Sequence, residues 1–396
     1  MIKIFHFADL HLDSPFSGGD IKRSEAGRRR LRELFCAMMR HVRETGYDLV
    51  LVAGDLYDCG FVTEETAELV CREFSSLPCP VVISPGNHDP YSKGSLYTCG
   101  KFSDNVHIFS SEKLERFDFD RLGVSVYGYA FTDNTLRANP VAETYVADPK
   151  RINILCAHTD VASPLSPYAP MTYADIEAAG FSYAALGHIH KAPEVFRSDS
   201  CVCAYSGFGE GRAFDEVGQG GAMAVSLFET GKRASVSLER LSFSKYSFEV
   251  EAIDVSYIGS DADIEKKIKA VIKEKNYNKN TALRVVLEGM TDVGYIPNAE
   301  LIAKKCIAEV DFIEIKDKTL PLLDGNFLEE DITVRGELYR ALKEKMTSGN
   351  ERERSLAGTA LRIGLAALEG RDLSPFMPKD DTAARSEETN LDGSEA

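Results

Sequence analysis

Eight polar side chains of the kinds that bind divalent cations lie in five short motifs within the first half of this sequence. They are Asp9, His11, Asp55, Asn87, His88, His158, His188 and His190. The set contains five of the eight histidines of the chain. Carboxylate and amide oxygens combined with imidazole nitrogens suit manganese, iron or zinc. Since this is about the number of ligands that two divalent cations need, the set predicts a two-metal site.

A pair of cations points to cleavage of a phosphoester. In two-metal hydrolases the ions lie about 3.5–4 Å apart, lower the pKa of a water and hold the oxygens of a displacement at phosphorus. The leaving oxygen also needs a proton. His88 follows the candidate ligand Asn87 and is not itself needed as a ligand, so it is the natural candidate for the acid.

Each motif also has an ordinary explanation as a turn. Gly54-Asp55 and Gly86-Asn87 consist of residues that turns favour, and an isolated Asp9-Leu10-His11 is a common strand ending. The elements around the motifs decide between the two explanations. Each motif follows a short apolar run typical of a buried strand, at residues 2–8, 48–53, 80–84, 152–157 and 183–186.

Helical patterns at Arg23–Thr45 and Glu64–Phe74 separate the first three strands. This alternation predicts a mostly parallel sheet, in which function gathers beyond the carboxyl ends of the strands. All five motifs are expected at that edge. In an extended backbone, the i, i+2 spacing of Asp9 with His11, and of His188 with His190, would place both side chains of each pair on one side.

The rest of the chain has a different texture. Further strands are expected up to residue 241. The loop at Ser206–Gly221 is Gly-rich, a composition that is typical of a mobile segment. After Ser247 an α+β pattern of some 75 residues carries no ligand-like cluster, and two helical stretches follow at 328–346 and 351–369. The expected divisions are a phosphoesterase-type core at 1–243, an accessory α/β domain at 247–322, a helical arm at 326–371 and a disordered acidic tail at 372–396.

Composition limits the partners and the compartment. The formal charge is 46 − 62 = −16, which argues against broad electrostatic contact with nucleic acid. Seven arginines between Arg23 and Arg43 form either a local phosphate-contact surface or an ordinary solvated helix face. The sequence contains no stretch of 18 apolar residues, so no membrane span is expected. Nine scattered cysteines and no signal-peptide pattern predict free thiols in a reducing cytoplasm.

The five motifs resemble, in their order, those of the calcineurin-like metallophosphoesterases. They read Asp-x-His, Gly-Asp-x-x-Asp, Gly-Asn-His-Asp, a lone His after a strand, and Gly-His-x-His, over roughly residues 1–240. The resemblance implies a four-layer α/β/β/α sandwich. It also implies roles: Asp9, His11 and His190 on one metal, Asn87, His158 and His188 on the other, and Asp55 bridging them. His88 would protonate the leaving group or hold the scissile phosphate, and Asp58 would orient it, with Asp89 as the alternative.

A narrower resemblance is to the SbcD-like and YhaO-like DNA repair exonucleases. It rests on the opening residues 5–16 and on the layout of core, small cap and C-terminal helices, although Tyr205-Ser206-Gly207 departs from the Tyr-Pro-Gly of that group. It implies manganese, a DNA substrate, a cap that helps to place DNA, a homodimer, and helices that dock on the coiled coil of an SbcC-like ATPase. The alternatives are a small-molecule phosphodiesterase or phosphatase on the same core, and a non-catalytic scaffold.

Overall fold

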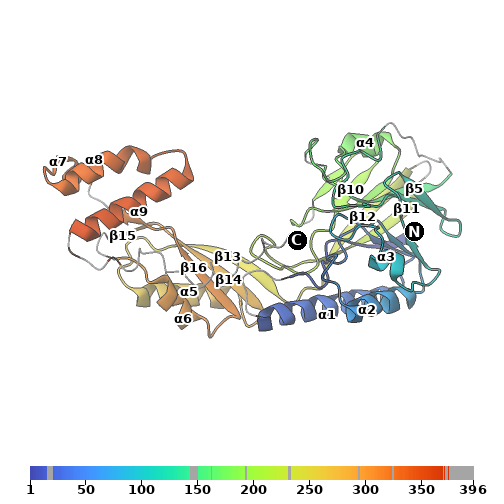
Figure 1. The fold of residues 1–396 in the computed structure, drawn as a ribbon, viewed down its shortest axis with the longest axis horizontal. Helices are drawn as coiled ribbons and strands as arrows, with labels where there is room; N and C mark the ends of the chain where they lie inside the picture. Colours follow the sequence, from blue (N-terminus) through green and yellow to red (C-terminus); the bar gives the residue numbers. More distant parts are fainter. Residues whose placement is uncertain are drawn as a thin grey trace, which may run out of the picture. The chain divides into compact units, whose positions relative to one another are not determined.

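Two six-stranded sheets form the first of the two compact units of the chain, Met1–Glu249 (Figure 1). The computed structural model describes residues 1–15, 21–142, 150–161, 163–191, 194–230, 233–292, 295–322, 325–368, 370 and 373. The first sheet has the order β12-β11-β1-β2-β3-β4. Its strands are β1 (Ile2–Phe7), β2 (Leu49–Val52), β3 (Val81–Ile83), β4 (Val106–Ile108), β11 (Gly221–Thr230) and β12 (Arg233–Ser242).

The second sheet has the order β5-β6-β7-β8-β10-β9. Its strands are β5 (Glu115–Phe119), β6 (Val124–Gly128), β7 (Ile152–His158), β8 (Tyr183–Gly187), β9 (Val195–Arg197) and β10 (Val202–Tyr205). Four helices accompany the sheets: α1 (Ile21–Thr45), α2 (Glu64–Ser75), α3 (Leu96–Cys99) and α4 (Tyr173–Ala178). Strands β1, β2, β3 and β4 run parallel, as do β6, β7, β8 and β10.

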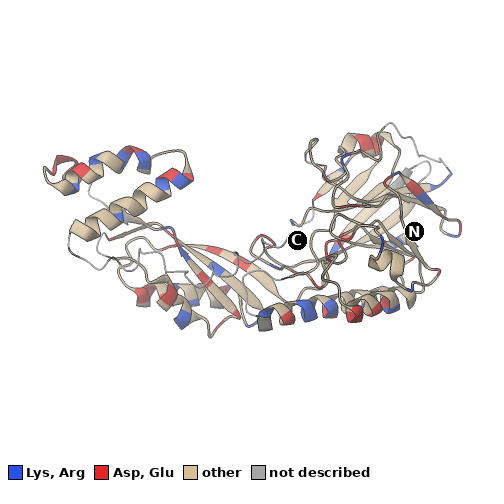
Figure 2. Ribbon diagram, in the orientation of Figure 1, with Lys and Arg blue, Asp and Glu red and all other residues tan. Residues whose placement is uncertain are grey.

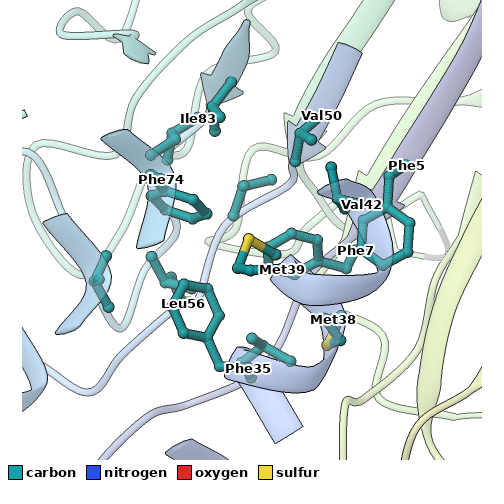
Figure 3. Packing of buried hydrophobic residues seen from close by; sticks show 14 of the residues in the cluster. Phe5, Phe7, Phe35, Met38, Met39, Val42, Val50, Leu56, Phe74 and Ile83 are labelled. Carbon is teal, nitrogen blue, oxygen red and sulfur yellow. The ribbon is translucent and has the colours of Figure 1, made fainter. Parts of the chain in front are cut away.

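Alternation along the buried strands separates the layers. In β1, Phe5 and Phe7 point into the buried cluster that the first sheet shares with α1 and α2, which also contains Phe35, Met38 and Phe74 (Figure 3). Ile4, on the opposite face of β1, joins the layer between the sheets. That layer is built from apolar side chains of both sheets, which is what a period of two residues per strand produces.

The outer face of the second sheet is covered by α4 and its neighbouring loops. Leu155, Ala184 and Leu186 pack there against Ile176 and Phe181. Together with the helix-covered face of the first sheet, this completes the order helix, sheet, sheet, helix. The four-layer α/β/β/α sandwich expected from the sequence is therefore confirmed.

Glycine lets the two sheets approach at the ends of β2 and β8. A Cβ atom on Gly187 would lie 2.0 Å from the Ala53 carbonyl oxygen, and a Cβ on Gly54 would lie 2.5 Å from Nδ1 of His158. Both positions therefore exclude any larger residue. The strand ends of both sheets meet at this point, and the candidate ligands follow from them.

The second unit, Val250–Ala396, has its own core. A three-stranded sheet, β13 (Ser247–Asp254), β14 (Thr281–Glu288) and β16 (Phe312–Asp317), packs on α5 (Asp261–Glu274) and α6 (Ala299–Cys306). The apolar stripe of α5, with Ile264, Ile268 and Ile272, supplies much of that core.

A small parallel pair, β15 (Met290–Asp292) and β17 (Leu320–Leu322), connects this core to the C-terminal helices. Buried Arg362 of α9 (Glu351–Leu368) donates from Nη2 to the hydroxyl of Thr291 at 3.1 Å. The helix expected at 328–346 is instead two helices, α7 (Gly325–Glu330) and α8 (Val334–Met346). They separate because Thr333 caps α8 with its side chain.

No helix in the described part of the chain is long and apolar enough to cross a membrane. The tail expected to be disordered, residues 372–396, lies outside the described residues except for Leu373.

Candidate metal centre

Four of the expected ligands lie just beyond strand ends, in left-handed backbone. The φ angles are 53° at Asp9, 46° at His11, 51° at Asp55 and 103° at His188. Extended alternation therefore does not bring Asp9 and His11 together, and that part of the sequence argument is wrong. Backbone hydrogen bonds do so instead, from Asp9 N to Gly54 O at 3.1 Å and from His11 N to Asp55 O at 3.0 Å.

Such φ angles cost roughly 1–3 kcal/mol each for a non-glycine residue and cluster at functional sites. The surrounding hydrogen bonds hold these residues in place. The backbone N–H of His188 donates to both carboxylate oxygens of Asp9 at 3.1 Å, and that of His88 donates to Oδ1 of Asp55 at 2.9 Å. The site is thus preorganised at the level of the main chain.

The first group of donors is Asp9, His11, Asp55 and His190, whose ligand atoms lie within 4.8 Å of one another. The Nε2 atoms of His11 and His190 are 3.2 Å apart. Oδ1 of Asp9 lies 3.6 Å from Nε2 of His190, and Oδ2 of Asp55 lies 3.6 Å from Nε2 of His11. Asp9, His11 and Asp55 are buried, and His190 is partly exposed.

The second group surrounds His158. Its Nε2 lies 2.9 Å from Oδ1 of Asn87 and 3.3 Å from Oδ2 of Asp55. The ring of His188 packs beside it, with ring centroids 5.1 Å apart. Oδ2 of Asp55 is therefore close to an imidazole of each group, which is the position that a bridging carboxylate needs.

The donor chemistry fits cations. His11 has Nδ1 2.6 Å from Oδ1 of Asp58, and His190 has Nδ1 2.8 Å from Oε1 of Glu216. A neutral imidazole that donates through Nδ1 has a lone pair on Nε2. The two Nε2 atoms at 3.2 Å therefore face each other as acceptors, and a positive charge between them relieves the repulsion. At His158, Nδ1 lies 2.9 Å from the Ala53 carbonyl and Nε2 faces two oxygens, so a bound cation would take the place of the proton that this nitrogen otherwise shares with them. The residues present thus suit two divalent cations.

Electrostatics in this pocket are strong because the groups are buried together. Burial raises the pKa of Asp9. At Asp55 burial opposes ionisation, but the charge of His158 and its hydrogen bond outweigh it and hold the pKa of Asp55 well below its usual range. In His158, burial acts to lower the pKa, and Asp55 overcomes it to raise the pKa to about 9. Asp55 is therefore the anionic centre that both groups share.

His88 lies at the rim, with about half of its side chain exposed. Its Nδ1 is 3.3 Å from Oδ1 of Asp58, and that hydrogen bond raises the pKa of His88. The same oxygen of Asp58 also holds His11. Oδ1 of Asp58 thus lies between the rings of His11 and His88.

Asp89, the alternative partner of His88, is buried and serves the backbone instead. Its carboxylate accepts from the backbone N–H groups of Asp55, Leu56 and Gly86 and from the hydroxyl of Tyr97. These bonds tie together the two loops that carry Asp55 and Asn87. Asp89 therefore stabilises the ligand loops, and Asp58 is favoured as the residue that orients His88.

Three of the described arginines of α1 have acidic partners of their own. Arg30 donates to Glu210 at 2.9 Å, Arg32 to Asp13 at 3.0 Å and Arg43 to Glu73 at 3.0 Å. Acidic residues lie among the basic ones of α1, and the charged residues of α2 are mostly acidic (Figure 2). The ordinary explanation of the Arg-rich stretch, a helix face that does not contact nucleic acid, is therefore favoured for these three side chains.

Sequence reasoning missed Glu216 and Arg212. Both lie in the Gly-rich loop, which the sequence analysis expected to be mobile, and the structure packs that loop against the first donor group. Arg212 and Glu216 are four residues apart in a loop. Outside a helix or strand, this spacing does not predict which way the two side chains point or that they are buried. The one available signal was the presence of four charged residues, Glu210, Arg212, Asp215 and Glu216, within a Gly-rich segment.

A two-sheet sandwich with paired carboxylate and imidazole donors at its strand ends has the arrangement that two-metal phosphoester chemistry requires. Residues 2–192 match the family model described as calcineurin-like phosphoesterase, and this part of the chain is a calcineurin-like metallophosphoesterase domain.

Several curated relatives carry related names. The chain is 29% identical to the uncharacterized metallophosphoesterase YhaO of Bacillus subtilis, over 73% of this chain and 72% of the relative. It is 24% identical to the SbcD component of the nuclease SbcCD of Staphylococcus epidermidis, over 70% and 77% of the two chains. It is 21% identical to the DNA double-strand break repair protein Mre11 of Methanopyrus kandleri, over 93% and 82%. The recognition of this family from the five motifs is confirmed.

Proposed function

We propose that this protein is a DNA repair nuclease that cleaves phosphodiester bonds of DNA with two divalent cations, manganese foremost and iron or zinc as alternatives. The observation that carries the proposal is the position of Oδ2 of Asp55, 3.6 Å from Nε2 of His11 and 3.3 Å from Nε2 of His158. A carboxylate between two donor groups can bridge two cations at the spacing that two-metal phosphoester chemistry uses. Two of the similar proteins are named as part of a nuclease and as a double-strand break repair protein.

The roles follow from the two donor groups. Asp9, His11 and His190 would hold one cation, Asn87, His158 and His188 the other, and Asp55 both. When bound, the cations supply an activated water and the positive charge that phosphate oxygens require. His88 donates a proton to the leaving oxygen from Nε2, because Nδ1 is held by Asp58.

The second unit supports a partner. We assign the α/β part, residues 247–322, to DNA placement, and the helices within 326–371 to docking on a coiled-coil ATPase of the SbcC type. Large apolar side chains at and next to these helices are exposed, with 95% of Ile332, 67% of Val334 and 69% of Leu356 accessible. A relative that is named as one component of a nuclease complex agrees with such docking.

A small-molecule phosphodiesterase is the second candidate. The ion pairs of Arg30, Arg32 and Arg43 favour it, because they neutralise charges that would otherwise contact a DNA backbone. The net charge of −16 agrees with it. The exposed apolar residues beside and on the C-terminal helices favour the nuclease, since a small-molecule enzyme has no use for them.

A parallel assay separates the candidates. Linear single- and double-stranded DNA and a chromogenic phosphodiester are each incubated with the full chain and Mn²⁺, alone and with a coiled-coil ATPase partner. The nuclease proposal expects degradation of DNA that chelation abolishes and His88→Ala suppresses. Cleavage of the chromogen with DNA intact in every mixture would establish the small-molecule enzyme instead.

A further inference from the structure

Behind the ring of His190 lies a buried carboxylate from the Gly-rich loop. Oε1 of Glu216 is 2.8 Å from Nδ1 of His190, on the side of the imidazole that faces away from the other donors. Only 3% of the surface of Glu216 is accessible. Burying a carboxylate is costly unless it is paired and hydrogen-bonded, so its partners define what it does.

Arg212 supplies the compensating charge. Its Nη2 lies 2.5 Å from Oε1 of Glu216, and its backbone N–H donates to Oε2 at 2.8 Å. The guanidinium also reaches the hydroxyl of Ser14 at 3.3 Å. Arg212 therefore fixes both oxygens of Glu216 and ties the loop to the segment that follows His11.

The loop is held at its other end as well. The carboxylate of Glu210, 4% accessible, accepts from Arg30 at 2.9 Å and lies within 3.4 Å of the hydroxyl of Ser244. A Cβ on Gly211 would come within 2.6 Å of the Glu216 carbonyl oxygen, so the chain folds closely on itself between the two glutamates. Glu216 thus has a defined position relative to His190.

The two donor groups differ in what supports their histidines. His11 and His190 both contact carboxylates through Nδ1, those of Asp58 and Glu216. Nδ1 of His158 faces a backbone carbonyl, that of Ala53. A carboxylate behind a ligating imidazole fixes its tautomer and makes the free nitrogen a stronger donor. The first group also contains the carboxylate of Asp9, where the second has the neutral amide of Asn87.

We propose that Glu216, oriented by Arg212, is a positioning residue that makes the Asp9–His11–His190 site the tighter of two unequal cation sites. Oε1 of Glu216 lies 2.8 Å from Nδ1 of His190, closer than Nη2 of Arg212 at 3.2 Å, and Arg212 donates to Glu216. The proton of a neutral His190 therefore belongs on Nδ1, which keeps Nε2 free and correctly aimed. The proposal rests on the proposed two-metal function, but it concerns metal binding and not turnover.

Manganese binding tests the proposal without any substrate. The full chain is stripped with chelator and titrated with Mn²⁺, and free Mn²⁺ is followed by electron paramagnetic resonance to obtain two dissociation constants. Glu216→Gln is nearly isosteric but uncharged, and it is expected to weaken the tighter ion by about 10- to 100-fold while changing the weaker ion little. Arg212→Gln should weaken the same ion by a smaller factor.

Two further variants serve as references. Asn87→Ala marks the other site and should weaken the weaker ion, so that its combination with Glu216→Gln weakens both. Glu73→Gln removes a carboxylate of α2 that forms an ion pair with Arg43 at 3.0 Å. This variant should leave both Mn²⁺ dissociation constants unchanged. Melting temperatures of the metal-free proteins show whether each variant is folded. If Glu216→Gln does not fold, the Mn²⁺ dissociation constants of Arg212→Gln test the proposal in its place.

The outcomes separate the inference from the function. Equal weakening of both ions, weakening of the ion that Asn87→Ala affects, or no change would each overturn the role of Glu216. Wild-type protein that binds no Mn²⁺ overturns it together with the proposed function. Wild-type protein that binds two ions but cleaves neither DNA nor a chromogenic phosphodiester refutes the function alone, and the binding constants still decide on Glu216.

Discussion

The side chains of His6 and Tyr183 meet between the two sheets, with Nδ1 of His6 2.8 Å from the hydroxyl oxygen of Tyr183. His6 lies on β1, which leads to Asp9, and Tyr183 lies on β8, which leads to His188. Both side chains are fully buried in a layer that is otherwise apolar. This hydrogen bond therefore joins one strand of each sheet, and each of these two strands leads to a candidate metal ligand.

Removing the hydroxyl tests the strength of this link. Tyr183→Phe leaves the imidazole of His6 buried without its partner, which should lower the free energy of unfolding by about 1–3 kcal/mol. Denaturant titration measures the loss. Tyr257→Phe is the control, because Tyr257 is 82% exposed and its hydroxyl should contribute little. Equal stability of the two variants would show that the link is energetically neutral.

His6 also makes stability depend on pH. Burial lowers the pKa of His6 from 6.5 to about 3, so the unfolded chain binds a proton that the native state rejects. The stability due to the neutral imidazole is complete above pH 6.5 and is lost as the pH falls toward 3. Unfolding free energies of the wild type and His6→Gln, measured from pH 7 to pH 5, should diverge in slope by up to about 1.4 kcal/mol per pH unit below the ordinary pKa of histidine. Parallel curves would contradict the assignment.

Asp55 should affect both cations at once. In Asp55→Asn the oxygen between His11 and His158 loses its charge, so both Mn²⁺ dissociation constants should rise, by about tenfold or more. Elemental analysis after dialysis against a fixed Mn²⁺ concentration measures the bound ions. Asn87→Ala, the single-site comparison, should deplete one ion. Depletion of only one ion in Asp55→Asn would mean that Asp55 does not bridge.

His88 should matter for turnover and not for metal content. His88→Ala removes the proposed acid and no ligand, so two ions should remain while kcat falls by about 10²- to 10⁴-fold. The matched control is His107→Ala, since His107 lies on β4 and packs against Phe117 and Phe119. Loss of an ion in His88→Ala would show that His88 is a metal ligand and would contradict its role as the acid.

Much of this protein follows from the chain alone. Apolar runs at residues 2–8, 48–53 and 80–84 specify strands because burial on both faces demands them, and the motifs that follow the strands identify the donor set. The order of those motifs also indicated the phosphoesterase family. Short elements such as β4, β5 and α4 were missed, because three to six residues carry too little periodicity to detect.

The tertiary structure decided how the donors meet. Asp9 and His11 come together through left-handed backbone and through hydrogen bonds to residues 54 and 55, which no local pattern encodes. It also decided which charges are paired: Arg30 and Arg32 meet Glu210 and Asp13, partners remote along the chain. Glu216 behind His190 is of the same kind. Local spacing predicts which residue types share a strand end, but ion pairs between distant segments depend on how the layers pack.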